Sequence, residues 1–384
     1  MQSKRLGLNL FLGAGDREKI HPGFYRLANS PEYKFSKKLL GKIQKKLSDP
    51  DGNFVEQFQT AGFDQRLFEL YLNESFEECG FTVERDYNRP DFILRCGDTS
   101  VAVEAVTASL SNQGIVEYDP VPNWGLGADG VREKSLNEWA VRLGSPLYTK
   151  YQKKYWELPQ VAGKPFVIAI QDMSRPGSTK ASAATLMQYL YGVEFGMQRD
   201  KNGILCPTFK SVKECQGAEK SIPSRFFDLP EAKYISAILF SNEGDLDTFN
   251  RIGYVAEDCD PNYIMLRYGM CDGYESNGTP APFVYRVGSC RAPCEKWSTG
   301  LVVAHNPTAI NPLPLGLFGD AVENRENSKG EIESSYNALF RPLSSKTVMH
   351  LASENIDGKI YQAYASHIVK ESKLLGKPFI SCFL

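Results

Sequence analysis

Several features that define common classes of protein are missing from this sequence of 384 residues. It contains no run of about 18 apolar residues, so we expect no membrane-spanning helix. It contains neither the G-x-S-x-G turn of serine hydrolases nor the P-loop pattern G-x-x-x-x-G-K-[ST], which excludes the sites built on those motifs. If the protein works in a process that consumes ATP, we expect a partner protein to supply the ATPase activity.

Histidine and cysteine show no strong metal-binding pattern. The four histidines lack metal-binding spacing to one another, and the nine cysteines include no C-x-x-C pair. Cys259, Cys271, Cys290 and Cys294 gather in a loop-rich stretch, which leaves two interpretations: a structural zinc site or scattered reduced thiols. The odd number of cysteines favours reduced thiols and a cytoplasmic location. Glycines that interrupt the N-terminal apolar stretch predict that it is not a signal peptide.

The formal net charge of −2 argues against non-specific binding of nucleic acid over the whole surface. It is compatible with a local basic groove, because phosphate contacts need only a few lysines or arginines. Residues 35–48 predict an amphipathic helix in which Leu39, Leu40, Ile43 and Leu47 share one face and lysines fill the remainder. That lysine face is either solvated or in contact with phosphates.

The most distinctive stretch contains two acidic residues at expected strand positions. Residues 92–107 predict two β-strands joined by a tight turn at residues 96–99. Asp91 opens the first strand, and Glu104 lies inside the second, which is otherwise apolar. Burial of a lone carboxylate is costly, whereas two carboxylates on adjacent strands suit a divalent metal that prefers oxygen ligands.

The remaining elements follow from hydrophobic periodicity and from the positions of glycine and proline. We expect a helix over residues 64–79 with Asp64 as N-cap and Gly80 as its stop, a strand over 81–85, the two strands above, a helix over 136–158 broken near Gly144–Pro146, and a buried strand over 166–170. Further along we expect a helix over 181–191, a strand over 234–241, short strands in a loop-rich stretch over 255–330, and a helix over 360–374. This order predicts a mixed β-sheet flanked by helices, an α/β fold. The strand over 234–241 is a candidate for the same sheet.

The order of acidic residues and elements resembles the PD-(D/E)XK nuclease superfamily. The matching parts are a helix with Glu69, Pro90–Asp91 at a strand start, and Glu104–Ala105–Val106 in the next strand. The resemblance covers residues 60–172 and implies a restriction-endonuclease-like core. It suggests an N-terminal helical region over residues 1–60, a nuclease-like core over 61–175, and a less regular C-terminal α+β region over 176–384 for recognition or dimerisation.

One position departs from the superfamily pattern, which has lysine two residues after the second acid where this chain has Val106. Some members of the superfamily take the lysine from the following helix, here the one expected over residues 136–158. Helical phase puts Lys154 nearly on the inward face of that helix and Lys150 at its edge. Both lysines are candidates, and we favour Lys150 because it could reach the site from the rim.

The resemblance implies an endonuclease that uses Mg²⁺ or Mn²⁺ to hydrolyse phosphodiester bonds, in DNA rather than RNA. Asp91, Glu104 and the Ala105 carbonyl would hold the metal, and Glu69 would hold a second metal or a metal-bound water. Lys150 or Lys154 would orient the attacking water or stabilise charge on the phosphate. A role in microbial defence or DNA processing, and a homodimer that cuts both strands, also follow from the resemblance.

The departure at Val106 supports an alternative from another functional class. In this hypothesis the protein is a catalytically inactive nuclease-fold module that binds nucleic acid or a protein partner. The aromatic side chains that are frequent over residues 226–274 could stack on bases, or they could fill the core. Metal-dependent cleavage distinguishes the enzyme from the module.

Overall fold

The computed structural model describes residues 8–13, 17–47, 49, 52–84, 87–108, 129–173, 183–199, 201, 205–217, 220–272, 280–338, 340–352 and 366. The chain divides into two compact units: the first takes its residues from 1–78, 243–299 and 338–384, the second from 79–242 and 300–337. This division differs from the three consecutive regions expected from sequence, because strands from after residue 236 join the sheet that contains residues 92–108. Over the described ranges, no helix is both long enough and apolar enough to cross a membrane.

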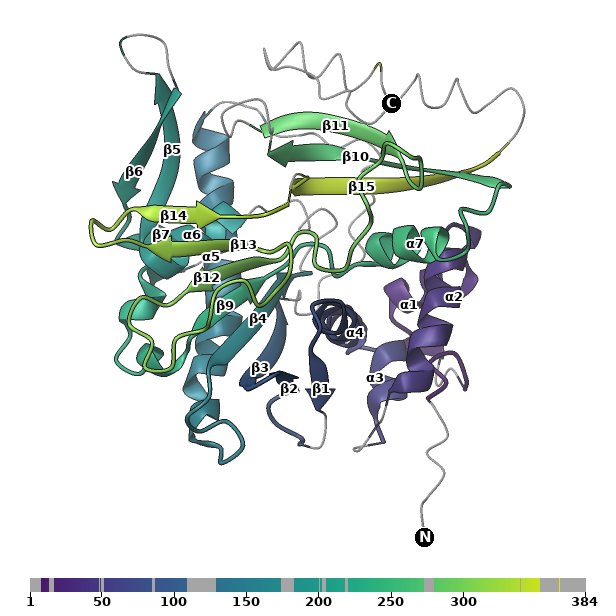
Figure 1. Ribbon diagram of the computed structural model, residues 1–384, viewed down its shortest axis with the longest axis horizontal. Coiled ribbons are helices and arrows are strands. Elements are labelled where there is room, and N and C mark those ends of the chain that lie inside the picture. Colours follow the sequence, from purple (N-terminus) through teal and green to yellow (C-terminus); the bar gives the residue numbers. More distant parts are fainter. Residues whose placement is uncertain are drawn as a thin grey trace. The chain divides into compact units, whose positions relative to one another are not determined.

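The second unit is built on a mixed sheet, which within the described residues has eight strands in the order β1-β2-β3-β4-β9-β12-β13-β14 (Figure 1). Their bounds are β1 (Thr82–Glu84), β2 (Phe92–Cys96), β3 (Thr99–Ala108), β4 (Phe166–Asp172), β9 (Ala237–Phe240), β12 (Val302–His305), β13 (Val322–Glu326) and β14 (Ile332–Ser335). Strands β3, β4 and β9 are parallel, whereas β2 runs antiparallel to β3 and β12 antiparallel to β9. The predicted mixed α/β sheet and its hairpin are confirmed, and the strand expected over 234–241 joins this sheet.

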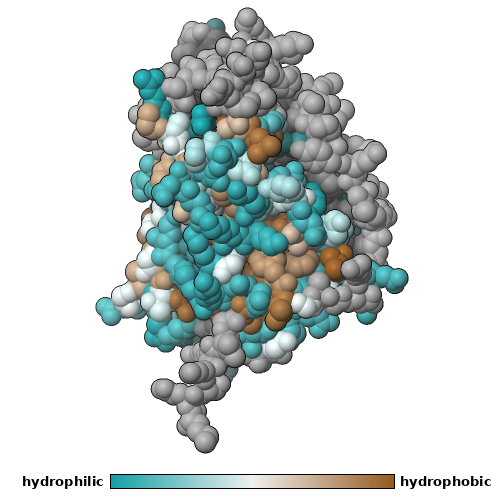
Figure 2. All heavy atoms as spheres, turned by 90° about the vertical axis from the view of Figure 1, so that its right-hand side faces the viewer, coloured by the Kyte–Doolittle hydropathy of each residue, from teal (hydrophilic) through white to brown (hydrophobic). Residues whose placement is uncertain are grey.

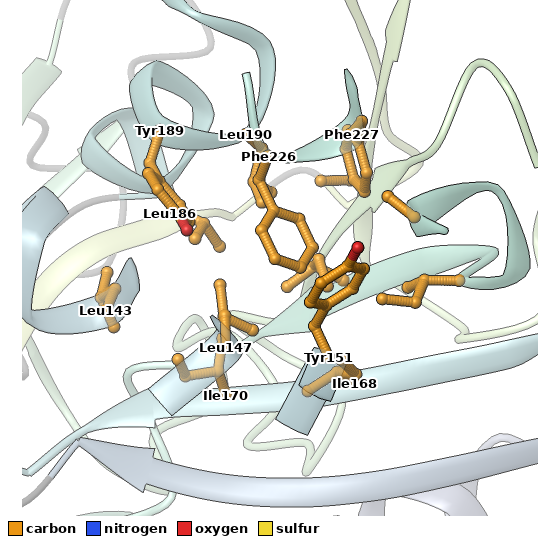
Figure 3. Close-up of a cluster of buried hydrophobic side chains, with 14 of the residues drawn as sticks. Leu143, Leu147, Tyr151, Ile168, Ile170, Leu186, Tyr189, Leu190, Phe226 and Phe227 are labelled. Carbon is orange, nitrogen blue, oxygen red and sulfur yellow. The ribbon is translucent and has the colours of Figure 1, made fainter. Parts of the chain in front are cut away.

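Helices α5 (Asp129–Gln152) and α6 (Ala183–Tyr191) cover one face of this sheet. Leu147 and Tyr151 of α5 and Leu186 of α6 pack with Ile168 and Ile170 of β4, as Figure 3 shows. All seven residues of β4 are buried, so both faces of the sheet are covered there. Burial of each large apolar side chain contributes roughly 1.5–3 kcal/mol, which makes this cluster the main support of the second unit.

The break expected in the long helix near Gly144–Pro146 is absent, and α5 continues through Pro146. Proline inside a helix costs about 3 kcal/mol. Leu143 and Leu147 lie on either side of it and are completely buried, so their packing offsets that cost.

The second unit is completed by the hairpin of β5 (Val193–Arg199) and β6 (Leu205–Ser211), the hairpin of β7 (Glu214–Gln216) and β8 (Ser221–Pro223), and the short 3-10 helices η4 (Tyr155–Glu157), η6 (Phe226–Asp228) and η7 (Ala232–Tyr234).

The first unit combines helices with a separate sheet of the order β11-β10-β15. Its elements are α1 (Pro22–Asn29), α2 (Lys34–Ile43), α3 (Phe54–Gln59), α4 (Phe63–Glu78), α7 (Leu246–Val255), β10 (Tyr263–Asp272), β11 (Pro280–Arg286), β15 (Pro342–Leu351), and the 3-10 helices η1 (Arg17–Lys19), η2 (Pro31–Tyr33) and η3 (Gln44–Lys46). The prediction that Asp64 caps α4 is wrong, because the helix already includes Phe63 and Asp64 lies in its first turn. Burial raises the pKa of Asp64 to about 6. The helix expected over residues 360–374 lies, apart from residue 366, outside the described residues.

A buried group of four charged side chains, the Arg–Glu network, joins α7 to the sheet of the first unit. It consists of Glu243, Arg251, Arg267 and Glu295, and each arginine contacts both carboxylates at 2.6–3.2 Å. Arg251 also donates to Thr347 of β15, and Arg267 to Tyr285 of β11. Burial alone would raise the pKa of Glu243, but Arg267 and Arg251 outweigh it and hold that pKa below its ordinary value.

Candidate active site

The β2–β3 hairpin brings the two predicted acidic residues together. Phe92 of β2 lies opposite Val103 of β3, so Asp91 and Glu104 are the next positions along the two antiparallel strands. The Asp91 N–H donates to Glu104 Oε2 at 3.3 Å, and the Ala105 N–H donates to Asp91 Oδ2 at 2.7 Å. Glu104 is only 4% exposed. These contacts fix the orientation of both carboxylates at one point of the sheet.

Lys150 reaches this point from helix α5. The helix packs its Leu147 and Tyr151 on the sheet face whose alternate residues include Glu104. Lys150 lies between these two contact residues in sequence, and its Nζ lies 2.5 Å from Glu104 Oε1. Its side chain is 15% exposed, so the ion pair is largely shielded from water. Position 106 is a valine, but Lys150 places an ammonium where the lysine of the superfamily pattern would be expected.

Lys154, the other predicted lysine, lies elsewhere. The helix expected to extend to residue 158 ends at Gln152, and Lys154 adopts a left-handed backbone conformation with φ 48°. This turn directs the chain into η4, whose Tyr155 and Trp156 are buried. The Lys154 ammonium pairs with Glu231 at 2.8 Å, and its side chain is 41% exposed. The expectation that Lys154 shares the inward face of the helix is therefore wrong.

Tyr155 also lies at the candidate active site, although it was not among the residues predicted from the sequence. It is 3% exposed, and its phenol lies near enough to Glu104 for the carboxylate to act on its pKa. Burial raises the pKa of Tyr155, and the neighbouring Glu104 carboxylate raises it further, so the phenol stays protonated. The Lys150 Nζ lies 5.9 Å from the centre of its ring. An aromatic residue after a helix normally indicates core packing, so no local signal marked this contact.

Glu69 lies on α4 in the first unit. Its carboxylate accepts a hydrogen bond from Arg66 at 2.6 Å and another from Gln65 at 2.9 Å. Among the residues that the structure describes, no three His, Cys, Asp or Glu side chains gather in a way that could hold a metal ion. The metal-ligand role predicted for Glu69 gains no support from this arrangement, and neither does a zinc site at the four clustered cysteines.

The chemistry of the remaining donors suits a hard cation. Mg²⁺ is usually held by one or two carboxylates, with water and substrate phosphates completing its coordination. Asp91 and Glu104 supply two carboxylates. In a strand the N–H and C=O groups of one residue point to the same side, so the Ala105 carbonyl points toward Asp91 as its N–H does. These three groups could therefore hold Mg²⁺ or Mn²⁺.

The lysines of α2 and of the following η3 are engaged with carboxylates of their own unit. Lys42 pairs with Glu257 at 2.6 Å, Lys38 contacts the same carboxylate, and Lys46 pairs with Glu77 at 3.1 Å. Lys38 and Lys42 hold the pKa of Glu257 below its ordinary value. Figure 2, which faces the side of Figure 1 where α2 is drawn, shows mainly hydrophilic side chains. These pairs favour the interpretation of a solvated face over one that contacts phosphates.

Comparison of the chain with protein-family models, with curated proteins and with solved structures finds no match in any of the three.

Proposed function

We propose that the protein is a metal-dependent nuclease with a restriction-endonuclease-like core and that Asp91, Glu104 and Lys150 form its active site. The main support is the meeting of these three side chains from two adjacent strands and the following helix, with Lys150 Nζ 2.5 Å from Glu104 Oε1. DNA is the substrate that the resemblance to the superfamily favours.

The burial of Glu104 is a further argument for function. An ion pair taken out of water has to overcome the loss of hydration of both charges, and apolar residues of similar volume are often as stabilising or more so. The neighbours of Glu104 along β3, Val103 and Ala105, are apolar and fully buried. A glutamate at this position is therefore explained more easily by the chemistry of its carboxylate than by the stability of the sheet.

Asp91, Glu104 and the Ala105 carbonyl would hold Mg²⁺ or Mn²⁺. Such a metal would supply the Lewis-acid chemistry that phosphodiester hydrolysis needs. The Ala105 N–H keeps the Asp91 carboxylate oriented, and the Asp91 N–H does the same for Glu104. Lys150 supplies a compact positive charge that stabilises the negative charge developing on the phosphate.

The test is cleavage of plasmid DNA, single-stranded DNA and RNA by the full chain in Mg²⁺ or Mn²⁺. Wild type is compared with Asp91→Asn, Glu104→Gln and the control Glu157→Gln, whose side chain is 65% exposed. We expect wild type and the control to cut. Each of the other two variants should lose roughly 100-fold or more in rate, the typical effect of removing one preorganised electrostatic contact.

Circular dichroism establishes that all variants are folded. If wild type cuts none of the substrates with either metal, or if Asp91→Asn and Glu104→Gln cut as fast as Glu157→Gln, the proposal is wrong.

One observation favours a second candidate, the inactive binding module. Both oxygens of Glu104 already accept hydrogen bonds from this chain, one from Lys150 and one from the Asp91 N–H. In a module of this kind the ion pair would be purely structural. The cleavage assays would then yield no product, whereas gel mobility shifts would show equal DNA binding by wild type and Asp91→Asn.

A further inference from the structure

The carboxylate of Glu104 is bound by this chain at the place where a metal would bind. Oε1 accepts a hydrogen bond from Lys150 Nζ at 2.5 Å, and Oε2 accepts one from the Asp91 N–H at 3.3 Å. The side chains of Lys150 and Glu104 are 15% and 5% exposed. The Asp91 carboxylate accepts a hydrogen bond from the Ala105 N–H, and Arg89, whose charge also acts on Tyr155, is exposed to solvent.

A divalent cation on Glu104 Oε1 would lie next to the Lys150 ammonium. Like charges a few Å apart repel strongly where water is largely excluded. We propose that Lys150 and a divalent cation compete for Glu104: the ammonium occupies the position beside Oε1 in the metal-free protein and leaves it when a metal binds. The inference rests on the proposed function only in taking Asp91 and Glu104 as the metal ligands.

The surroundings of Lys150 allow its ammonium to lie either beside Glu104 or away from it. Its four-carbon stem is flexible, and the ring of Tyr155, 5.9 Å from Nζ, lies within cation–π distance. The Asp91 N–H donates to Glu104 Oε2 independently of the lysine. Glu104 can therefore keep its orientation while the ammonium moves. In the metal-free protein Lys150 balances the charge of Glu104, and in the metal-bound protein it is available to a phosphate.

The competition predicts an unusual effect of removing the lysine. Lys150→Met leaves the buried Glu104 carboxylate without its cation, so the metal-free variant should unfold at a lower temperature than wild type. The same substitution removes the competitor, so metal should bind tighter by roughly ten-fold or more. Metal should therefore raise the unfolding temperature of Lys150→Met more than that of wild type.

The experiment is a titration of the full chain with Mn²⁺ alone, followed by calorimetry and by the electron-paramagnetic-resonance signal of free Mn²⁺. It compares wild type, Lys150→Met, Lys150→Arg, the double variant Lys150→Met/Glu104→Gln, and Lys233→Met as an exposed-lysine control. We expect tighter binding only for Lys150→Met, near-wild-type binding for Lys150→Arg and the control, and loss of binding for the double variant. Equal affinities for wild type and Lys150→Met, or no binding by either, overturn the inference.

A measurement on wild type alone covers the case in which Lys150→Met does not fold. Acetylation of lysine amines by a water-soluble reagent is followed by mass spectrometry with and without Mn²⁺, with Lys233 as the internal reference. We expect Lys150 to be acetylated several-fold faster in the presence of Mn²⁺, because its ammonium has left Glu104. An unchanged rate for Lys150 overturns the inference.

The two proposals can fail separately. Metal-dependent exposure of Lys150 without cleavage of any nucleic acid would support the competition and refute the nuclease. Cleavage that needs Asp91 and Glu104, together with equal Mn²⁺ affinity of wild type and Lys150→Met, would support the nuclease and refute the competition.

Discussion

Arg251 and Arg267 in the first unit each contact both Glu243 and Glu295, whereas in the second unit the ammonium of Lys150 pairs with the carboxylate of Glu104. In the Arg–Glu network the charges are balanced, and neutral groups complete the hydrogen bonds: Thr347 accepts one from Arg251, and Tyr285 donates one to Glu295. At the candidate active site the ion pair joins one lysine to one carboxylate. The chain therefore buries charge in two ways, as a network of four charged side chains and as a single lysine–glutamate pair.

The difference indicates which group is structural and which can exchange partners. Planar guanidinium groups bind two carboxylates at once and hold them in a fixed geometry. A lysine is a point charge on a flexible stem, and another cation can replace it. The network therefore suits a permanent connection between α7 and its sheet, and the Lys150–Glu104 pair suits a site that gains a ligand.

The largest effect should come from breaking the network. We expect Arg251→Met to lower the free energy of unfolding by about 3–5 kcal/mol, because two buried carboxylates are left beside one arginine. Urea unfolding measures this loss. The control is Lys34→Met, whose ion pair with Asp260 is partly exposed and should matter much less. Equal losses in the two variants would contradict the structural role of the network.

A smaller, pH-dependent effect should appear beside the network at Asp245, the N-cap of α7. Burial, then Asp247 and Glu243, raise the pKa of Asp245 from 3.8 to about 7. The folded protein therefore keeps a proton that the unfolded chain loses between about pH 4 and pH 7, so stability falls as pH rises through this window.

Asp245→Asn removes this penalty and keeps the cap to the Thr248 N–H, because asparagine caps helices as well as aspartate does. We expect the variant to exceed wild type in unfolding free energy by roughly 2–4 kcal/mol at pH 8, since each pKa unit corresponds to about 1.4 kcal/mol. At pH 4 the two proteins should be equally stable. Thermal unfolding at both values is the measurement, and a difference that does not depend on pH would refute the assignment.

The smallest effect is expected at Lys154, which sharpens the contrast with Lys150. Its ion pair with Glu231 is exposed to solvent and screened by it. Lys154→Met should leave the free energy of unfolding and the rate of DNA cleavage unchanged within error. Urea unfolding and the plasmid cleavage assay measure both quantities. A loss of cleavage comparable to that of Glu104→Gln would contradict the prediction and show that Lys154 takes part in the reaction.

The sequence predicted the parts of the fold that depend on local signals. The hairpin of β2 and β3 follows from two short apolar stretches around a turn, where Gly97 adopts φ 57° and meets no steric cost. The buried strand β4 follows from its continuous apolar run. Helical phase predicted Lys150 only at the edge of the inward face, and its reach from the rim made it the favoured lysine; it lies within α5, less than one turn from the core contacts Leu147 and Tyr151.

Features set by distant contacts could not be predicted in this way. The end of α5 at Gln152 depends on burial of Tyr155 and Trp156, and the phase argument for Lys154 failed because it assumed a longer helix. The Arg–Glu network joins residues 8 to 44 positions apart along the chain. Arginines at such positions in a sequence look like ordinary surface residues, because their partners are known only once the strands have paired.

The path of the chain also restricts how this protein could be divided. It passes from one unit to the other after residues 78, 242, 299 and 337. A fragment limited to residues 61–175 would lack β9 and leave the fully buried β4 as an open sheet edge, which promotes aggregation. Residues 79–337 are needed to keep the whole sheet, and they include a segment of the first unit. Recombination between genes could not transfer either unit as one continuous piece, so the two units have to be inherited together.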